Sequence, residues 1–201
     1  MRQIVLLTAV LALSPCAPAS AGTAELATFK DKLTGKPVTQ VRYTAADGEA
    51  NDVTASVVAG VWGIRDASAP MKAATGCAIV DEHTARCINP TPAYYQLYVA
   101  TGDLVDTVTI PAQLPNVLVD GGAGNDVLRG GPRVGLSGGA GNDLIEFDGA
   151  ALDLFCGAGD DLLGALSTGG PVLVESAVRT ARASASGCSS CRSTHDARAA
   201  R

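Results

Sequence analysis

The chain is poor in aromatic residues and in histidine. Its 201 residues include one tryptophan, three phenylalanines, four tyrosines and two histidines, and the formal net charge is −5. This composition limits the folded part to one or two small domains. The two histidines, His83 and His195, also leave little material for a histidine-dependent catalytic triad or for a histidine-based zinc site.

Long apolar runs are equally scarce. The marked one, Ile4–Leu13, precedes the small residues Ala19–Ala21, and residues 1–21 are therefore predicted to be a secretory signal peptide cleaved after Ala21. This run is too short to anchor the chain in a bilayer, and no later run qualifies. We expect a secreted, extracellular chain without a membrane span.

Six cysteines are present. Cys16 ends a Leu-Ser-Pro-Cys sequence similar to a bacterial lipoprotein processing box, an alternative to simple cleavage, although proline replaces the small residue expected before the cysteine. Removal of the signal leaves five cysteines in a compartment that favours disulfides, so one stays unpaired or pairs with another molecule. Cys77 and Cys87 flank two short strand-like segments around a polar turn, which predicts a disulfide across a hairpin.

Glycine and aspartate, by contrast, are concentrated in one stretch, where nearly the same octapeptide occurs three times. The copies are GGAGNDVL at 121–128, GGAGNDLI at 138–145 and CGAGDDLL at 156–163. Glycines allow positive φ and let the backbone aim its carbonyl oxygens at one point. The aspartate at the sixth position adds a carboxylate. Carbonyls and carboxylates are hard oxygen donors that suit Ca²⁺, and do not suit zinc or copper.

The spacing of the copies predicts how they are arranged. Their starts are separated by 17 and 18 residues, and a nine-residue unit is half of one coil, so turns on the same side recur about every 18 residues. The intervening half-coils, at 130–133 and 147–150, keep glycine but lack the sixth-position aspartate. We therefore predict a short parallel β-roll over residues 101–165, with metal along one edge only.

Stacking would also bring like charges together. Rungs about 4.8 Å apart would align Asp126, Asp143 and Asp161, and each neighbouring pair would repel by roughly 1 kcal/mol in water or roughly 3–4 kcal/mol at a dielectric of 20. We expect two Ca²⁺ ions, one in each gap between turns, whose binding contributes to folding. The residues expected at these sites are Gly121, Gly122, Ala123, Gly124, Asp126, Gly138, Gly139, Ala140, Gly141, Asp143, Cys156, Gly157, Ala158, Gly159, Asp160 and Asp161.

The repeated motif Gly-Gly-x-Gly-x-Asp-x-apolar-x resembles that of the haemolysin-type (repeats-in-toxin) calcium-binding family. It matches at 121 and 138, and departs at 156, where Cys156 replaces the first glycine. The resemblance implies a calcium-binding β-roll in which turn carbonyls and sixth-position aspartates are the ligands. A single copy would be explained as well by an ordinary hairpin turn; three copies at near-fixed spacing favour the roll.

The residues that surround the repeats are strongly acidic. Between 101 and 161 there are ten acidic residues against Arg129 and Arg133, which is typical of a cation binder and argues against nucleic acid as a partner. The segment Thr101–Ile110 reads as a decayed copy of the same turn-and-strand unit. Its Asp106 precedes Asp126 by 20 residues.

Residues 22–100 predict a β-rich leader. Val38–Thr44, Val53–Val58 and Val61–Asp66 have strand-like composition, and the last two are close enough for a hairpin. Three repeats are at the lower limit for burying a solenoid core. We therefore expect the leader to cap the open end of the roll, where unpaired strand edges otherwise promote aggregation.

Residues 166–201 predict a largely disordered tail. From Arg179 onward arginine, alanine, serine and threonine dominate without an apolar period. Cys188-Ser-Ser-Cys191 followed by His195 is a weak signal for a zinc or redox site. A disulfide from Cys156 to one of these two cysteines is left open by the sequence.

The residues 135–139 match the Gly-x-Ser-x-Gly pattern of hydrolases, but that pattern needs a strand–turn–helix and a histidine partner, and here it overlaps the second glycine turn. We therefore expect an all-β, non-enzymatic calcium-binding protein. The alternative is a surface adhesion protein that uses the calcium-loaded roll as a rigid spacer toward a cell-surface or cell-wall partner. A decayed repeat protein that no longer holds metal is a third interpretation.

Overall fold

A computed structural model describes residues 20–165, except 31, 33, 90, 91, 113, 115 and 149–152, together with residues 192–193. In this part of the chain all regular elements are strands, and there is no helix. No element there is a helix of the length and apolarity needed to cross a bilayer. Nearly all of the predicted signal peptide and tail, with Cys16, Cys188, Cys191 and His195, lies outside the described residues.

The strands lie along the chain in the following order. They are β1 (Gly22–Lys30), β2 (Pro37–Thr44), β3 (Asp52–Val58), β4 (Val61–Asp66), β5 (Met71–Ala73), β6 (Cys77–Asp81), β7 (Thr84–Ile88), β8 (Pro92–Ala100), β9 (Thr107–Ile110), β10 (Val117–Ala123), β11 (Val127–Gly130), β12 (Val134–Ala140), β13 (Leu144–Phe147), β14 (Leu154–Ala158), β15 (Leu162–Ala165) and β16 (Arg192–Ser193).

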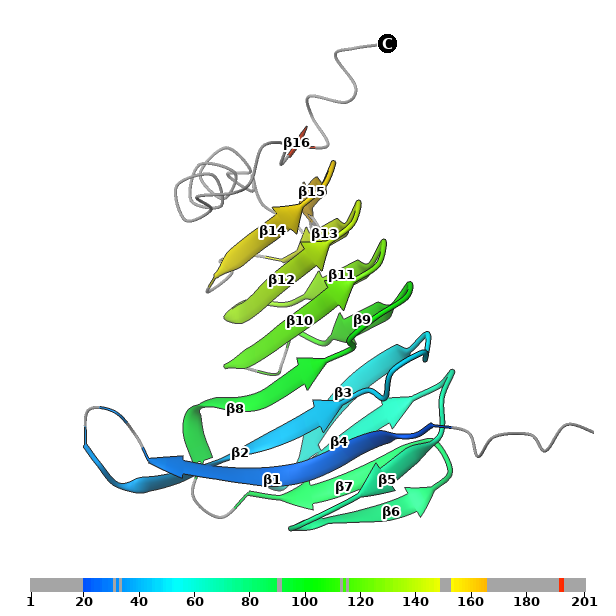
Figure 1. The fold of residues 1–201 in the computed structure, drawn as a ribbon. Coiled ribbons are helices and arrows are strands. Elements are labelled where there is room, and N and C mark those ends of the chain that lie inside the picture. Colours follow the sequence, from blue (N-terminus) through cyan, green and yellow to red (C-terminus); the bar gives the residue numbers. More distant parts are fainter. Residues whose placement is uncertain are drawn as a thin grey trace, which may run out of the picture.

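These strands form two sheets that face each other (Figure 1). The seven-stranded sheet has the order β14-β12-β10-β8-β2-β1-β5, and the nine-stranded sheet has the order β16-β15-β13-β11-β9-β3-β4-β7-β6. From β8 to β15 the chain alternates between the two sheets, so one strand of each sheet and the turn that joins them form a rung. All the strand pairs between these rungs are parallel.

The three glycine turns lie one above another on a single edge of this parallel β-solenoid. Gly122 is in register with Gly139, and Gly139 with Gly157. The 17- and 18-residue steps in the sequence are therefore the lengths of one full coil, and the predicted stacking is confirmed. Each strand after a turn has four residues, of which every second one points inward, as in the buried Leu128 and Ile145.

The parallel pairing continues into the leader. Strand β8 pairs with β2, and β9 pairs with β3, so β2–β3 and β8–β9 stack as two further rungs below the glycine turns. The predicted strands Val38–Thr44, Val53–Val58 and Val61–Asp66 are confirmed within β2, β3 and β4, and β3–β4 is the predicted hairpin. At the N-terminal end, β1 adds antiparallel to β2 and then pairs parallel with β5, while β4, β7 and β6 complete the nine-stranded sheet with antiparallel pairs.

The predicted hairpin disulfide is also confirmed. Strands β6 and β7 pair antiparallel with Cys77 opposite Cys87, and the two cysteines are bonded with their Cα atoms 4.1 Å apart. This hairpin forms the edge of the nine-stranded sheet. The cross-link therefore joins the outermost strand to its neighbour.

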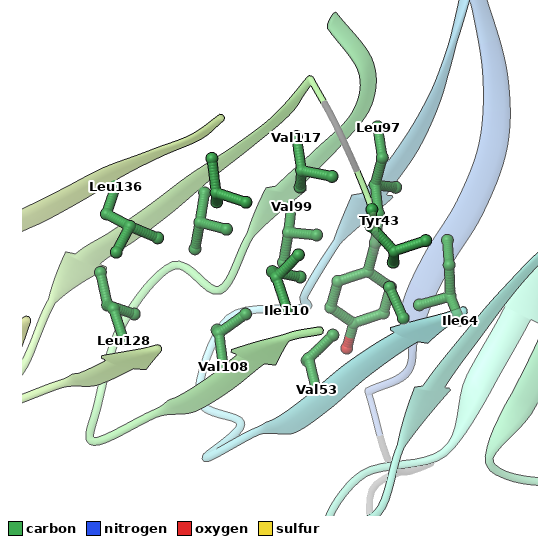
Figure 2. Packing of buried hydrophobic residues seen from close by; sticks show 14 of the residues in the cluster. Tyr43, Val53, Ile64, Leu97, Val99, Val108, Ile110, Val117, Leu128 and Leu136 are labelled. Atoms are coloured by element: carbon green, nitrogen blue, oxygen red, sulfur yellow. The ribbon is translucent and has the colours of Figure 1, made fainter. Parts of the chain in front are cut away.

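One hydrophobic core runs between the sheets through leader and repeats (Figure 2). Leu136, Val117 and Val99 of one sheet face Leu128 and Val108 of the other, and all five are fully buried. At the leader end the ring of Tyr43 lies in the same layer, near Val53 and Ile64. The rungs thus share one core along the axis of the solenoid.

The serine of the hydrolase-like pattern lies within this framework. Ser137 is inside strand β12, in parallel register with Asp120 and Phe155. His83 belongs to the β6–β7 turn, where its Nδ1 lies 2.9 Å from the carbonyl oxygen of Asp66. Ser137 is therefore part of a ladder and is not at a strand-to-helix turn, the arrangement on which a nucleophile elbow depends.

Candidate metal site at the glycine turns

The second and fourth residues of each turn must be glycine for two reasons. Gly139 has φ of 108° and Gly141 has φ of 135°, a region that side chains with a Cβ rarely adopt. A Cβ on Gly139 would also lie 2.0 Å from the carbonyl oxygen of Gly122, and one on Gly141 would lie 1.7 Å from that of Gly124. The turns therefore stack with carbonyl oxygens directed at the glycine Cα atoms of the next rung.

The sixth residues form a buried column, here called the aspartate column, of Asp106, Asp126, Asp143 and Asp161. Their exposed fractions are between 0% and 2%. In each step of the column one carboxylate oxygen accepts the backbone N–H of the aspartate one rung closer to the N-terminus. The donor–acceptor pairs are Asp106 N to Asp126 Oδ1 at 2.9 Å, Asp126 N to Asp143 Oδ1 at 2.9 Å and Asp143 N to Asp161 Oδ1 at 3.0 Å.

The second oxygen of each carboxylate has no such donor. Oδ2 of all four aspartates is buried and has no hydrogen-bond partner in the described part of the chain. An ionised carboxylate without a partner is costly to bury. These four oxygen atoms are therefore buried acceptors that a bound cation or a proton would stabilise.

The first residue of each turn borders these oxygens. A Cβ on Gly121 would lie 2.5 Å from Asp126 Oδ2 and 2.7 Å from the carbonyl oxygen of Gly138. The next turn repeats the arrangement, since a Cβ on Gly138 would lie 2.2 Å from Asp143 Oδ2 and 2.5 Å from the carbonyl oxygen of Cys156. Each missing Cβ thus leaves a small cradle on which a carboxylate oxygen and the next rung's carbonyl oxygen converge.

Burial makes these carboxylates reluctant to ionise. It raises the pKa of Asp106, Asp126 and Asp143 to about 6, against the opposing effect of the backbone N–H donors. Neighbouring carboxylates add to the rise, as Asp126 and Asp161 do for Asp143. Burial also raises the pKa of Asp161, with Asp160 adding to it. The aspartate column would therefore be stabilised by binding either protons or a cation.

The fifth residues of the turns form a separate, exposed row. Asn125 Oδ1 accepts the backbone N–H of Asn142, and Asn142 Oδ1 accepts that of Asp160, both at 2.8 Å. Asp160, predicted as an additional donor, therefore lies in this exposed row and not in the aspartate column. The third residues are exposed too, and the carbonyl oxygens of Ala140 and Ala158 accept N–H bonds from Gly124 and Gly141.

Cys156 is the departure from the motif, and it is fully buried. Its carbonyl oxygen takes the place that Gly138 O has one rung earlier, so the backbone of the third turn keeps the pattern. Its pairing with Cys188 or Cys191 involves residues outside the described ones. The side chain distinguishes this turn from the other two.

The described residues contain no group of three or more His, Cys, Asp or Glu side chains arranged to hold a metal ion. Two carboxylates flank each gap in the glycine turns, so a cation there would need backbone carbonyls for the rest of its ligands. Comparison with protein-family models, with curated proteins and with solved structures finds no match to this chain. The resemblance to haemolysin-type repeats accordingly depends on residues 121–163 alone.

The column extends further than the three motifs. Asp106 belongs to it, as its spacing of 20 residues from Asp126 could indicate, and the turn around it also stacks, with Asp103 bridging to Ala123. Below it, Asp106 Oδ1 accepts the N–H of Asn51 at 2.7 Å. Nothing in the sequence around Asn51 identifies this contact, because the two residues are 55 positions apart.

Proposed function

We propose that this chain is a secreted calcium-binding protein whose β-roll is stabilised by Ca²⁺. The observation that carries the proposal is the set of buried, unpartnered Oδ2 atoms repeated over successive glycine turns. A fold with a complete set of internal partners would leave few such atoms. Three of them, on Asp126, Asp143 and Asp161, belong to the three glycine turns and are separated by one rung each, which indicates a common missing partner.

The donor set favours calcium among the metals. The oxygens at the cradles are carboxylate and backbone carbonyl oxygens, and Ca²⁺ takes six to eight ligands of this kind. We assign one ion to the gap between the turns of Asp126 and Asp143 and a second to the gap between those of Asp143 and Asp161. The turn carbonyls of the first to fourth positions complete each set. A bound cation would neutralise the buried carboxylates, and its binding free energy would add to folding.

The leader and the disulfide fit this role. We infer that β1 and β4–β7 act as the cap of the roll, because they extend both sheets beyond the parallel rungs and close the N-terminal end of the shared core with mostly antiparallel pairs. The Cys77–Cys87 disulfide supports an oxidising, extracellular compartment, where calcium is abundant. Affinity in the range of extracellular modules, about 10⁻⁴ to 10⁻³ M, would suffice there.

The decisive experiment changes the one aspartate shared by both gaps without removing its structural hydrogen bond. In Asp143→Asn the side-chain Oδ1 can still accept the N–H of Asp126, while the charge of the second oxygen is lost. We expect the parent protein to gain thermal stability on addition of millimolar CaCl₂ and the variant to gain little. Without calcium the variant should be at least as stable as the parent, because a buried charge has been removed.

A matched control removes one negative charge outside the column. Glu146→Gln, in β13 three residues from Asp143, breaks an ion pair between partly exposed side chains, with Arg129 Nε 2.6 Å from Glu146 Oε2. Such pairs contribute little, so its calcium response should equal that of the parent. Equal responses of the parent and Asp143→Asn would refute the ligand assignment. No response of the parent to calcium would favour the decayed-repeat alternative.

A further inference from the structure

Another buried carboxylate without a full set of partners is Glu49, two residues before the Asn51 that donates to Asp106 at the N-terminal end of the aspartate column. Glu49 is 9% exposed; its Oε2 accepts the N–H of Ala46 at 3.1 Å, and its Oε1 is buried and has no partner in the described residues. Glu49 lines a pocket of about 300 Å³ together with Ser20 and Pro70. Because Ser20 is two residues before β1, the N-terminal end of the described chain borders this pocket.

The first residue of β1, Gly22, contacts both a residue that lines this pocket, Pro70, and the hydroxyl of Tyr43. Gly22 is buried, and its N–H donates to the carbonyl oxygen of Pro70 at 3.2 Å. A Cβ on Gly22 would lie 2.4 Å from the hydroxyl oxygen of Tyr43. Burial and the nearby carboxylates of Asp66 and Glu49 raise the pKa of that hydroxyl. Gly22 is thus buried against a tyrosine hydroxyl that has the carboxylates of Asp66 and Glu49 as neighbours.

We propose that removal of residues 1–21 creates a buried α-ammonium at Gly22, which pairs with Glu49 and locks the N-terminal rung of the mature fold. The inference rests on the proposed secretion. A signal peptidase would hydrolyse the Ala21–Gly22 peptide bond with one water: the hydroxyl adds to the Ala21 carbonyl carbon, the C–N bond breaks, and the nitrogen of Gly22 takes up protons to become an ammonium.

The contacts indicate why Glu49 would be the partner. Asp66 already accepts five donors, namely the hydroxyl of Tyr43, the side-chain amide of Asn51 and the N–H groups of Asp52, Ser68 and Ala69. An ammonium has three donors, of which one can keep the bond to Pro70. Glu49 Oε1 is the acceptor without a donor, and a buried ion pair needs such complete hydrogen bonding to be favourable.

The position also explains the choice of residue. Any side chain at 22 would meet Tyr43, so only glycine brings the chain end this close to the network. In the unprocessed chain the same nitrogen is a neutral amide with one N–H, which can satisfy Pro70 but adds no charge opposite Glu49. Removal of residues 1–21 would therefore change the stability of the fold as well as release the mature chain.

The first test compares two chains that differ by one residue, one beginning at Gly22 and one beginning at Ala21. We expect the Gly22 chain to melt several degrees higher, the shift that a single favourable buried interaction produces in a domain of this size. The difference should disappear in Glu49→Gln and persist in Glu82→Gln, a matched change at an exposed glutamate. Equal melting temperatures of the two parent chains would overturn the proposal.

The second test measures access to the amine. An unprotected α-amine reacts faster with an N-hydroxysuccinimide ester than a lysine near neutral pH, because its pKa is about 8. In the Gly22 chain we expect its labelling, followed by mass spectrometry, to be at least tenfold slower than at the exposed Lys72, and to be restored by Glu49→Gln. Rapid labelling of Gly22 in the folded parent would contradict the proposed pairing.

Mass spectrometry of the secreted protein identifies its mature N-terminus, which we expect to be Gly22. Any other N-terminus would also overturn the proposal.

None of these measurements requires calcium. A chain whose Gly22 amine is protected but which ignores calcium would retain the present inference and lose the proposed function. A chain that responds to calcium with a freely reactive Gly22 would do the opposite.

Discussion

At the scale of single residues, a glycine can be favoured by a positive φ, by the absence of space for a Cβ, or by both. The glycines of the stacked turns combine the two. Gly122 has φ of 97°, and a Cβ there would lie 2.2 Å from the carbonyl oxygen of Gly102. Gly102, at the same place one rung below, has φ of 91° but open space where its Cβ would be. The two positions therefore allow backbone strain and steric contact to be measured independently.

We predict that Gly122→Ala lowers the free energy of unfolding by about 2–4 kcal/mol, because strain and collision with a neighbouring backbone add. Gly102→Ala should cost only about 1 kcal/mol, from the positive φ alone. Urea unfolding of both variants, in chelator to remove any effect of metal, measures the difference. Similar costs at the two positions would mean that the rungs are not as closely stacked as described.

At the scale of elements, the aspartate column determines how stability depends on pH. The pKa values of Asp106, Asp126 and Asp143 in the folded protein are about 6, above the ordinary aspartate value of about 3.9 in an unfolded chain. The folded state then binds more protons than the unfolded state between these values. The stabilisation is complete below about pH 4 and is lost as the pH rises through 6.

We therefore predict that the calcium-free protein melts at a higher temperature at pH 5 than at pH 7.5, the reverse of a protein held by ionised carboxylates. Thermal unfolding in chelator at the two pH values measures it. Asp143→Asn should reduce the dependence, since it removes one of the titrating groups. A calcium-free protein that gains stability from pH 5 to 7.5 would show that the column is ionised and compensated in another way.

The β6–β7 hairpin is the second element with a separable contribution. Its disulfide closes a loop of 10 residues at the edge of the nine-stranded sheet, and a loop of that length accounts for about 2–3 kcal/mol in the chain-entropy model. Replacing Cys77 and Cys87 by alanine should lower the stability by about this amount in urea unfolding. The shift produced by calcium should be unchanged, because the hairpin contributes no residue to the glycine turns.

At the scale of the whole molecule, the leader and the repeats share one core. Val99 of β8 and Val117 of β10 face Val108 of β9 and Leu128 of β11 without an interruption between them. A solenoid with few repeats gains most of its stability from such contacts between neighbouring rungs. The division at residue 100 separates the two strands of a single rung, β8 and β9.

This continuity predicts one cooperative unfolding transition for the calcium-loaded chain in calorimetry. Leu128→Ala, in the repeat region, should cost about 2–5 kcal/mol and move the entire transition to lower temperature. If the leader unfolded separately, the variant would instead shift one of two transitions and leave the other in place. The same experiment thus tests the cap assigned to the leader.

The sequence by itself determined the local conformation and the coil length. Glycine at the second and fourth positions permits positive φ, copies 17 and 18 residues apart predict stacking on one side, and Cys77 with Cys87 around a polar turn predicts a hairpin. These follow from backbone sterics and strand periodicity, which act within about one coil. The solenoid and the disulfide could therefore be predicted without coordinates.

Only the tertiary structure decided where the carboxylates point and where the column ends. Asn51 donates to Asp106, and Tyr43 donates to Asp66. Both hydrogen bonds join segments of unrelated sequence and unequal length that stack as neighbours. The burial of each Oδ2, and of Glu49 Oε1, depends on rungs that stack from other parts of the chain. Such contacts arise from packing of the whole sheet pair, so no local pattern of residues encodes them.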